Sequence, residues 1–305
     1  MGIPYEMAVL LLQASRAGAD LSRPLCLGRL RMSIRPYELA ALLDRLAPNA
    51  DPGVRARALA SSWADPFLEL LGAEAVHTLD ASPYEGADIV HSLNEPLPTD
   101  LCERFSVVID GGTLEHVFNI PVALDNVMKL LRPNGVFMAC GPGNNQIGAG
   151  FFQFSPELYF RTFSPPNGFR VLGLYLAAAG QTHWWQVRDP AESGRPSFFR
   201  ASGETRILCV ARKDDPDGHL REIPTQSKYT TAWDAAAGSP AAVGPQAEQE
   251  RTVPPLKRRV FDVLPRGVVS GYRDWRTVRR TRRRSPGDLR RVDPLTMTFE
   301  ESRNG

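Results

Sequence analysis

Short hydrophobic runs alternate with longer segments of helical periodicity through the first 212 residues. Seven runs have the length and the apolar content of strands. They cover residues 24–28, 75–80, 87–93, 105–110, 136–140, 169–176 and 205–211. Apolar residues recur at helical spacing in residues 5–16, 36–46, 54–62, 65–71 and 114–131. Strands that alternate with helices predict an α/β fold with a mostly parallel, doubly wound sheet.

Residues 105–140 form the clearest strand-helix-strand unit. Residues 107–109 are an uninterrupted β-branched run, which suits a strand that is covered on both faces. Pro121 is expected in the first turn of the following helix. Ligands of open α/β sheets bind beyond the carboxyl ends of the strands. The loops at residues 110–112 and 141–145 are therefore the first candidates for the site.

The last two strand candidates are joined differently. Residues 180–203 connect them without a strong helical period, and a connection of this kind favours antiparallel pairing. The sequence thus predicts a seven-stranded sheet that is closed by an antiparallel edge strand, in a domain of residues 1–212.

The composition changes after residue 212. Residues 213–255 contain a tract rich in Ala, Gly, Pro and Gln, which buries too little apolar surface to order itself, so we predict a flexible linker. Residues 256–305 form a basic C-terminal extension with an arginine-rich run at 279–284. Such a run can bind nucleic acid or an anionic membrane surface, but we favour a docked helix or a solvated end.

The net charge, the apolar content and the cysteine spacing exclude several classes of protein. The net charge of +2 over 305 residues does not by itself indicate a nucleic-acid partner. No window approaches the roughly 20 apolar residues of a membrane span, and no secretory signal pattern is visible. The four cysteines have neither metal-ligand nor disulfide spacing, and three of them lie in apolar strand candidates. We expect a cytoplasmic protein with no metal site and leave the oligomeric state open.

An acidic residue, Asp80, ends the second strand candidate. A carboxylate in this position can accept both hydroxyls of a ribose in an adenine-containing cofactor. The turn after the first strand keeps only Gly28 and has no G-x-G-x-x-G pattern, which argues against a dinucleotide with its pyrophosphate. A cofactor without phosphates, such as S-adenosylmethionine, needs less of a phosphate cradle.

Five segments together resemble the class I S-adenosylmethionine-dependent methyltransferases. They are Leu-Asp-Ala-Ser-Pro-Tyr-Glu-Gly-Ala (79–87), Leu-Asn-Glu-Pro-Leu-Pro (93–98), Val-Ile-Asp-Gly-Gly-Thr-Leu-Glu-His-Val (108–117), Leu-Arg-Pro-Asn-Gly (131–135) and Phe-Gln-Phe-Ser-Pro-Glu-Leu (152–158). The resemblance is strongest to methyltransferase-domain proteins of polysaccharide and natural-product biosynthesis. It implies a Rossmann-like class I methyltransferase fold, S-adenosylmethionine as cofactor and a small-molecule methyl acceptor.

The resemblance also assigns residues to the cofactor, from its methionine part through the ribose and adenine to the sulfonium. They are Gly28, Asp80, Ala81, Ser92, Leu93, Asp110 and Gly111. Two positions depart from the family pattern, because the first glycine motif is reduced to Gly28 and Ser92 stands where an aspartate often reaches the adenine. These departures motivate an alternative, in which a methyltransferase-like protein has lost cofactor binding and acts as a binding or scaffolding subunit.

A general base assists methyl transfer when the acceptor is a hydroxyl. His116 leads the candidates, because an unperturbed histidine has a pKa of about 6.5. Glu115 beside it and His183, next to two tryptophans, are further candidates. The alternatives are structural: Glu115 and His116 would cap or orient the loop, and His183 would belong to core or lid packing.

Asn144, Asn145 and Gln153 are the candidates for binding a polar acceptor, although a Gly-Asn-Asn run is also ordinary turn chemistry. The sequence therefore favours O- or N-methylation of a sugar-like or natural-product intermediate. A further alternative is an RNA methyltransferase that uses the basic extension, for which strongly salt-dependent RNA binding is expected.

Overall fold

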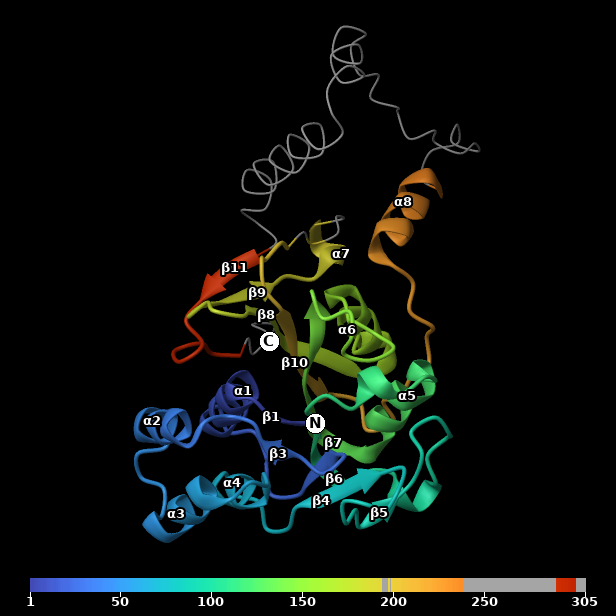
Figure 1. Ribbon diagram of the computed structural model, residues 1–305. Helices are drawn as coiled ribbons and strands as arrows, with labels where there is room; N and C mark the ends of the chain where they lie inside the picture. The colour runs from blue at the N-terminus through green and yellow to red at the C-terminus, as the bar shows by residue number, and fades with distance from the viewer. Residues whose placement is uncertain (194–196, 198, 238–288, 300–305) are drawn as a thin grey trace, which may run out of the picture. The chain divides into compact units, whose positions relative to one another are not determined.

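The computed structural model describes residues 1–193, 197, 199–237 and 289–299. These residues fall into two compact units. The first unit comprises Met1–Val187, Ala201–Pro224 and the described part of Arg290–Gly305. The second unit contains the helices α7 (Pro190–Ser193) and α8 (Ser227–Ala237). A mixed sheet with the strand order β11-β9-β8-β10-β7-β6-β2-β4-β5 organises the first unit (Figure 1).

Five neighbouring strands form the parallel half of this sheet. They are β5 (Ile89–Val90), β4 (His77–Asp80), β2 (Pro24–Leu27), β6 (Phe105–Asp110) and β7 (Leu131–Asn144). Numbered along the chain, their spatial order is that of strands 3-2-1-4-5 in a Rossmann fold. The Rossmann-like α/β fold class predicted from the sequence is confirmed.

The other half of the sheet is antiparallel. Strand β10 (Thr205–Lys213) pairs with both β7 and β8 (Phe169–Ala178). Strands β9 (Trp184–Val187) and β11 (Leu289–Val292) extend the sheet to nine strands. The antiparallel strand β10 therefore lies inside the sheet rather than at its edge, because its residues 207–210 are apolar and buried on both faces.

Helices cover both faces of the sheet (Figure 1). On one face, α1 (Tyr5–Arg16), α2 (Pro36–Leu46) and α4 (Asp65–Leu70) share a core with Cys26, Ile109 and Met138 of the parallel strands. The short helix α3 (Pro52–Ala60) follows α2. On the other face, α6 (Pro156–Thr162) leads into Phe163, whose ring stacks on Phe137 of β7 at 4.9 Å between centroids.

The predicted helix over residues 114–131 is divided into two elements. The 3-10 helix η2 (Leu114–His116) comes first, and α5 (Ile120–Leu130) follows after a short connection. Pro121 lies in the first turn of α5, as predicted, since proline has no N–H to donate and disfavours helical backbone in the residue before it. Glu115 and His116 therefore belong to a short turn at the end of β6.

Other elements refine the prediction. The cap of α6 is confirmed, because the Ser155 side chain accepts a hydrogen bond from the Leu158 N–H. The strand β1 (Gly2–Ile3), which the sequence did not predict, pairs in parallel with β3 (Arg31–Met32). Two further 3-10 helices are η1 (Thr99–Leu101) and η3 (Pro165–Asn167).

The predictions for the C-terminal third are only partly covered by the described residues. Strand β10 ends at Lys213, and α8 lies within the predicted linker of residues 213–255. Residues 238–255, and most of the predicted basic extension with its arginine-rich run, lie outside the described residues, so both boundaries stay predictions. In the part of the chain that the structure describes, no helix is long and apolar enough to cross a membrane.

Candidate functional site

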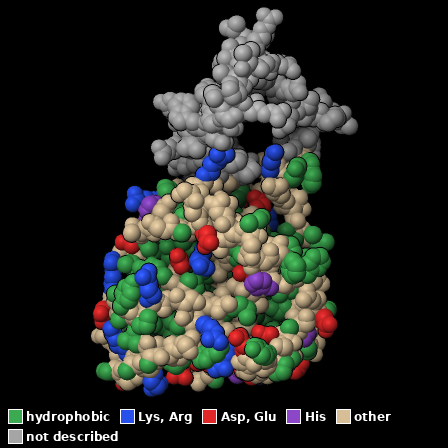
Figure 2. Space-filling view, in the orientation of Figure 1, with side chains coloured by type: hydrophobic (Ala, Val, Ile, Leu, Met, Phe, Trp, Pro, Cys, Tyr) green, Lys and Arg blue, Asp and Glu red, His purple; other side chains and the backbone are tan. Residues whose placement is uncertain are grey.

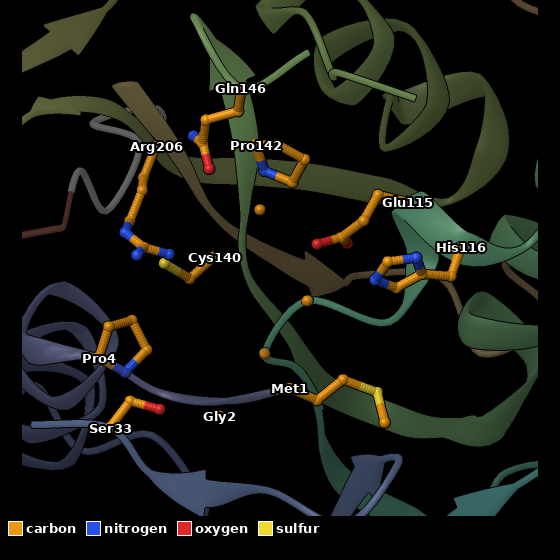
Figure 3. Close-up of a pocket in the computed structure, with 13 residues that line it drawn as sticks. Met1, Gly2, Pro4, Ser33, Glu115, His116, Cys140, Pro142, Gln146 and Arg206 are labelled. Carbon is orange, nitrogen blue, oxygen red and sulfur yellow. The ribbon is translucent and has the colours of Figure 1, made fainter. Parts of the chain in front are cut away.

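A cavity of about 250 Å³ lies at the carboxyl ends of β6 and β7 (Figure 3). The two loops predicted to form the site meet here, since Gly111 and Gly112 contribute one side and Gly141 another. Glu115 and His116 lie together on one wall, and Arg206 lies on the opposite wall next to Cys140. The cavity thus places a carboxylate across from a guanidinium.

Asp110 forms the buried end of β6 beneath this cavity and has no exposed surface. Its Oδ1 atom accepts hydrogen bonds from the backbone N–H groups of Gly112, Thr113 and Leu114 at 3.2, 2.8 and 3.3 Å. Its Oδ2 atom is buried without a hydrogen-bond partner among the described residues. Burial, together with the nearby Glu115 carboxylate, raises the pKa of Asp110 to about 7.

Glu115 projects from η2 into the cavity and is only 6% exposed. Its Oε2 atom also has no hydrogen-bond partner in the described part of the chain, and burial raises the pKa of its carboxyl. Space for this side chain depends on Gly112, which has a left-handed φ of 101° and whose Cβ would lie 3.1 Å from Glu115 Oε1. Asp110 and Glu115 form a pair of buried carboxyl groups with an unsatisfied oxygen each.

Cationic and neutral groups complete the cavity. Arg206 lies on β10 and is 3.7 Å from Glu6 Oε2 in an ion pair. His116 is exposed at the cavity, and Cys140 is buried, with a thiol pKa raised to about 12 by burial. Cys140 therefore stays protonated, like the other strand cysteines Cys26 and Cys209, which are buried as predicted.

The N-terminal segment forms another wall of the cavity. Gly2 donates its backbone N–H to the Gly111 carbonyl at 2.9 Å. The hydroxyl of Thr113 donates to the Leu27 carbonyl, and its oxygen lies 2.8 Å from Met1 Sδ. Gly28 has a φ of 69°, and a Cβ there would lie 2.7 Å from Met1 Sδ. The position that the resemblance assigns to the methionine part of a cofactor therefore accommodates a thioether, and the Met1 side chain occupies that position in this structure.

Of the seven predicted cofactor residues, only Gly111 lines this cavity. Asp80 Oδ1 accepts the backbone N–H of Ser82 at 3.1 Å, so one carboxylate oxygen stabilises its own turn. Ala81 is exposed next to it, Ser92 accepts the Asn94 N–H at 3.3 Å, and Leu93 is buried.

Arg29 links the segments at the carboxyl ends of β2 and β4, which we call the β2–β4 rim (residues 28–31 and 80–86). Its guanidinium donates to the Glu85 carbonyl at 3.0 Å and lies over the Trp63 ring at 4.2 Å. The Arg31 guanidinium lies over the same ring at 4.3 Å. The rim is therefore tied together by the side chains of the chain itself.

The predicted acceptor residues have structural partners. Asn145 Nδ2 donates to the carbonyls of Ala201 and Gly203 at 3.0 and 2.9 Å, and Asn144 Oδ1 accepts the Asn145 N–H. Gln153 Oε1 accepts the Gln146 N–H at 2.9 Å. None of the three lines the cavity, so their role in acceptor binding stays a prediction.

His183 lies just before β9, where its ring contacts that of Trp185 at 5.3 Å between centroids. It does not line the cavity either, and its catalytic role also stays a prediction.

The structure adds residues that the sequence analysis missed. Gln146 lines the cavity and donates from Nε2 to the Thr205 carbonyl at 2.8 Å. Its only sequence signal was its position directly after the Asn144-Asn145 turn. Arg206 and Met1 had no local signal, because β10 and the N-terminus reach the site only through long-range pairing.

No protein-family model and no curated protein matches the chain, but solved structures do. One is the N-methyltransferase NodS from Bradyrhizobium japonicum WM9, with 12% identity, coverage of 69% of this chain and 94% of that chain, and a TM-score of 0.35. Another is a putative sarcosine dimethylglycine methyltransferase from Galdieria sulphuraria, with 14% identity, 69% and 85% coverage, and a TM-score of 0.40.

A third is the Burkholderia thailandensis 1,6-didemethyltoxoflavin-N1-methyltransferase with bound S-adenosylhomocysteine, with 13% identity, 69% and 79% coverage, and a TM-score of 0.31. All three are methyltransferases, the class that the sequence resembles. The likeness is one of fold, so it assigns no activity and no substrate to this chain.

Proposed function

We propose that this chain is an S-adenosylmethionine-dependent methyltransferase that methylates nitrogen or oxygen of a polar small molecule. The pair of buried carboxyl groups, Asp110 and Glu115, carries the proposal. Both lie at the carboxyl ends of the parallel strands, where α/β sheets bind their ligands, and each keeps one oxygen without a hydrogen-bond partner among the described residues. A buried unsatisfied oxygen costs free energy unless a ligand or water hydrogen-bonds to it.

The pair also has the acid-base chemistry that the reaction needs. Burial raises the pKa of the Glu115 carboxyl, and a carboxylate with a raised pKa is a stronger general base. Glu115 faces the cavity and takes the proton that the acceptor loses, while Asp110 below it sets the local charge. His116, which is exposed at the cavity, passes that proton to solvent.

Gly28, Thr113 and Asp80 would hold the cofactor. Bound S-adenosylmethionine supplies an electrophilic methyl group on its sulfonium. We call the space between Gly28 and Thr113 the Gly28 cradle. It fits the sulfur-containing end of the cofactor, because it already contains the thioether of Met1. Met1 has to leave the cradle for the cofactor to enter. Methyl transfer is an in-line displacement, so the chain contributes mainly by positioning the acceptor.

One observation favours a second candidate, a scaffolding subunit without cofactor. The Met1 side chain lies at Gly28, and Arg29 bridges the β2–β4 rim. Side chains of the protein itself therefore occupy the region where the cofactor would bind. The RNA methyltransferase alternative depends on the arginine-rich run, which lies outside the described residues.

Calorimetric titration of S-adenosylmethionine and S-adenosylhomocysteine into the purified protein tests the proposal. Binding of both is expected, and Asp80→Ala is expected to weaken it at least tenfold, about 1.4 kcal/mol. Asp100→Ala, at an exposed position in η1, is the matched control and should leave the affinity unchanged. A folded protein that binds neither compound contradicts the proposal and supports the scaffolding role.

A further inference from the structure

Three large apolar side chains are exposed on the two segments that contribute His116 and Gln146 to the cavity. Phe118 is 72% exposed, Ile147 91% and Phe151 65%. The rings of Phe118 and Phe151 meet edge to face, with centroids 5.6 Å apart. We call these three residues the apolar shelf. Figure 2 shows hydrophobic side chains gathered beside a histidine on this face of the molecule. Contiguous apolar patches on a protein surface mark sites of interaction.

The shelf and the cavity are built from the same two segments. Phe118 follows His116 by two residues, and Ile147 directly follows Gln146, and both of these neighbours line the cavity. The backbone N–H of Phe151 donates to the Glu115 carbonyl at 2.8 Å. The backbone at Glu115 therefore carries a carboxyl group of the cavity and also holds part of the shelf.

The loop that carries two of the three shelf residues, Ile147 and Phe151, is held in place by close packing and hydrogen bonds. Gly150 packs so closely on η2 that a Cβ there would lie 2.6 Å from the Glu115 carbonyl oxygen. Gln146 is held at both ends, by Gln153 and by the Thr205 carbonyl. A preformed apolar surface costs little ordering entropy on binding, which suits ligand recognition.

Aromatic contacts continue from the shelf toward the floor of the cavity. Phe151 contacts Phe152, and Phe152 stacks on Phe154, with 6.4 Å between centroids in each pair. Phe154 in turn lies against Gly141, at 3.4 Å from the position of a Cβ there. A row of aromatic side chains thus connects the shelf with Gly141, which lines the cavity.

The two surfaces together define a class of ligand. The unsatisfied oxygen of Glu115 in the cavity requires an N–H or O–H donor, and a positive charge satisfies a carboxylate best. The rings of the shelf attract apolar groups and also cations. We propose that the acceptor is an amine with an aromatic or other apolar group, which binds with its ammonium at Glu115 and its apolar group on Phe118, Ile147 and Phe151.

This inference rests on the proposed methyl transfer, but it is tested by binding alone. The probes are 2-phenylethylamine, its alcohol analogue 2-phenylethanol and the polar amine ethanolamine, each titrated calorimetrically without cofactor. 2-Phenylethylamine is expected to bind at least tenfold more tightly than either analogue. Equal affinity for the alcohol and the amine, or for the two amines, overturns the proposal.

Variants distinguish the apolar contact with the shelf from the ionic contact with Glu115. Phe118→Ala and Phe151→Ala are expected to weaken 2-phenylethylamine at least fivefold and to leave ethanolamine unchanged, whereas Glu115→Gln should weaken both amines. Tyr37→Ala removes a comparably exposed ring from α2 and is the matched control. Shelf variants that bind 2-phenylethylamine as the wild type does overturn the proposal, as does a concentration-dependent dimer in sedimentation that both shelf variants abolish.

The two proposals fail in different experiments. Amine binding without S-adenosylmethionine binding contradicts the methyltransferase proposal and supports the shelf as a ligand site. S-Adenosylmethionine binding with no preference for the apolar amine supports the enzyme and overturns the inference about its acceptor.

Discussion

The β6–β7 cavity and the β2–β4 rim lie at the same edge of one sheet, yet they differ in how their polar groups are satisfied. Glu115 in the cavity and Asp110 beneath it each keep a buried oxygen without a partner among the described residues. At the rim, Asp80 accepts a hydrogen bond within its own turn, and Arg29 donates a hydrogen bond that links two loops. The cavity is thus prepared for a ligand, whereas the rim has to exchange internal contacts for ligand contacts.

This difference has a consequence for affinity. A ligand of the cavity gains hydrogen bonds that the folded chain lacks, whereas a cofactor at the rim gains only the surplus over the contacts that it displaces. We therefore expect acceptor chemistry to be strongly sensitive to single substitutions, and cofactor affinity to improve when a competing side chain is removed. The following predictions test the two sides, from the largest effect to the smallest.

The largest effect is expected for Glu115→Gln. The amide keeps the shape of the side chain but cannot take a proton, so methyl transfer should slow by about 10²- to 10⁴-fold. Calorimetric binding of S-adenosylmethionine should be unchanged, because Glu115 lies in the cavity and not at the rim. Turnover that stays within threefold of the wild type would assign the base to another residue, with His116→Gln as the next variant to measure.

Asp110→Asn is expected to change the pH dependence of folding stability. The folded carboxyl keeps its proton up to pH about 7, whereas the usual value is 3.8. Asp110 therefore favours the folded state below pH 4, and that advantage is lost as the pH rises through 7. A pKa difference of about 3 corresponds to roughly 4 kcal/mol. Between pH 4.5 and 8, which covers most of this change, the Asn variant should gain about 3 kcal/mol relative to wild type.

Urea unfolding of both proteins at the two pH values measures this gain. The Asn side chain keeps the oxygen that accepts the three backbone hydrogen bonds, so the turn is preserved in the comparison. A difference between the proteins that does not vary with pH would show that Asp110 titrates normally.

Gly150→Ala tests how strongly folding stability depends on the close packing of this loop against Glu115. The added Cβ would meet the backbone oxygen of Glu115 at 2.6 Å, so the loop has to move, at a cost of about 1 to 3 kcal/mol. Gly148→Ala is the matched control in the same loop, because nothing lies within 4 Å of its Cβ position. Thermal unfolding should separate the two variants. Equal melting temperatures would mean that the loop moves at no cost.

The smallest effect is expected at the rim. Met1→Ala, made behind a cleavable leader, removes the thioether from the Gly28 cradle and should tighten S-adenosylmethionine binding by about three- to tenfold, since displacement of Met1 no longer opposes it. Met1→Leu keeps the cradle filled and should show no such gain. Equal affinities for the Ala and Leu variants would show that Met1 does not compete with the cofactor.

The sequence predicted the sheet and one side of the site, because both are encoded locally. Apolar runs that end in Asp and Gly mark the carboxyl ends of strands, and this pattern placed Asp110, Gly111, Glu115 and His116 near the cavity that the structure contains. The mixed topology was harder to predict, since the interior position of β10 depends on pairings between distant segments.

The other side of the site had no local signature. Arg206 reaches the cavity only because β10 inserts beside β7, and Met1 reaches it only because Gly2 bonds to the Gly111 carbonyl. The resemblance placed the cofactor at Gly28, but nothing in the sequence indicated that a side chain of the chain itself lies there. Contacts over such separations follow from the folded topology, not from residue patterns.

The position of Met1 also allows ligand binding to be followed by spectroscopy. The chain has six methionines, and the methyl group of Met1 lies against Gly28 beneath the Thr113 hydroxyl. In protein labelled with ¹³C-methyl methionine, this one resonance should sharpen and move toward its random-coil position when a ligand enters the cradle. Occupancy could then be followed in solution by nuclear magnetic resonance, without an assay for product and before any acceptor is identified.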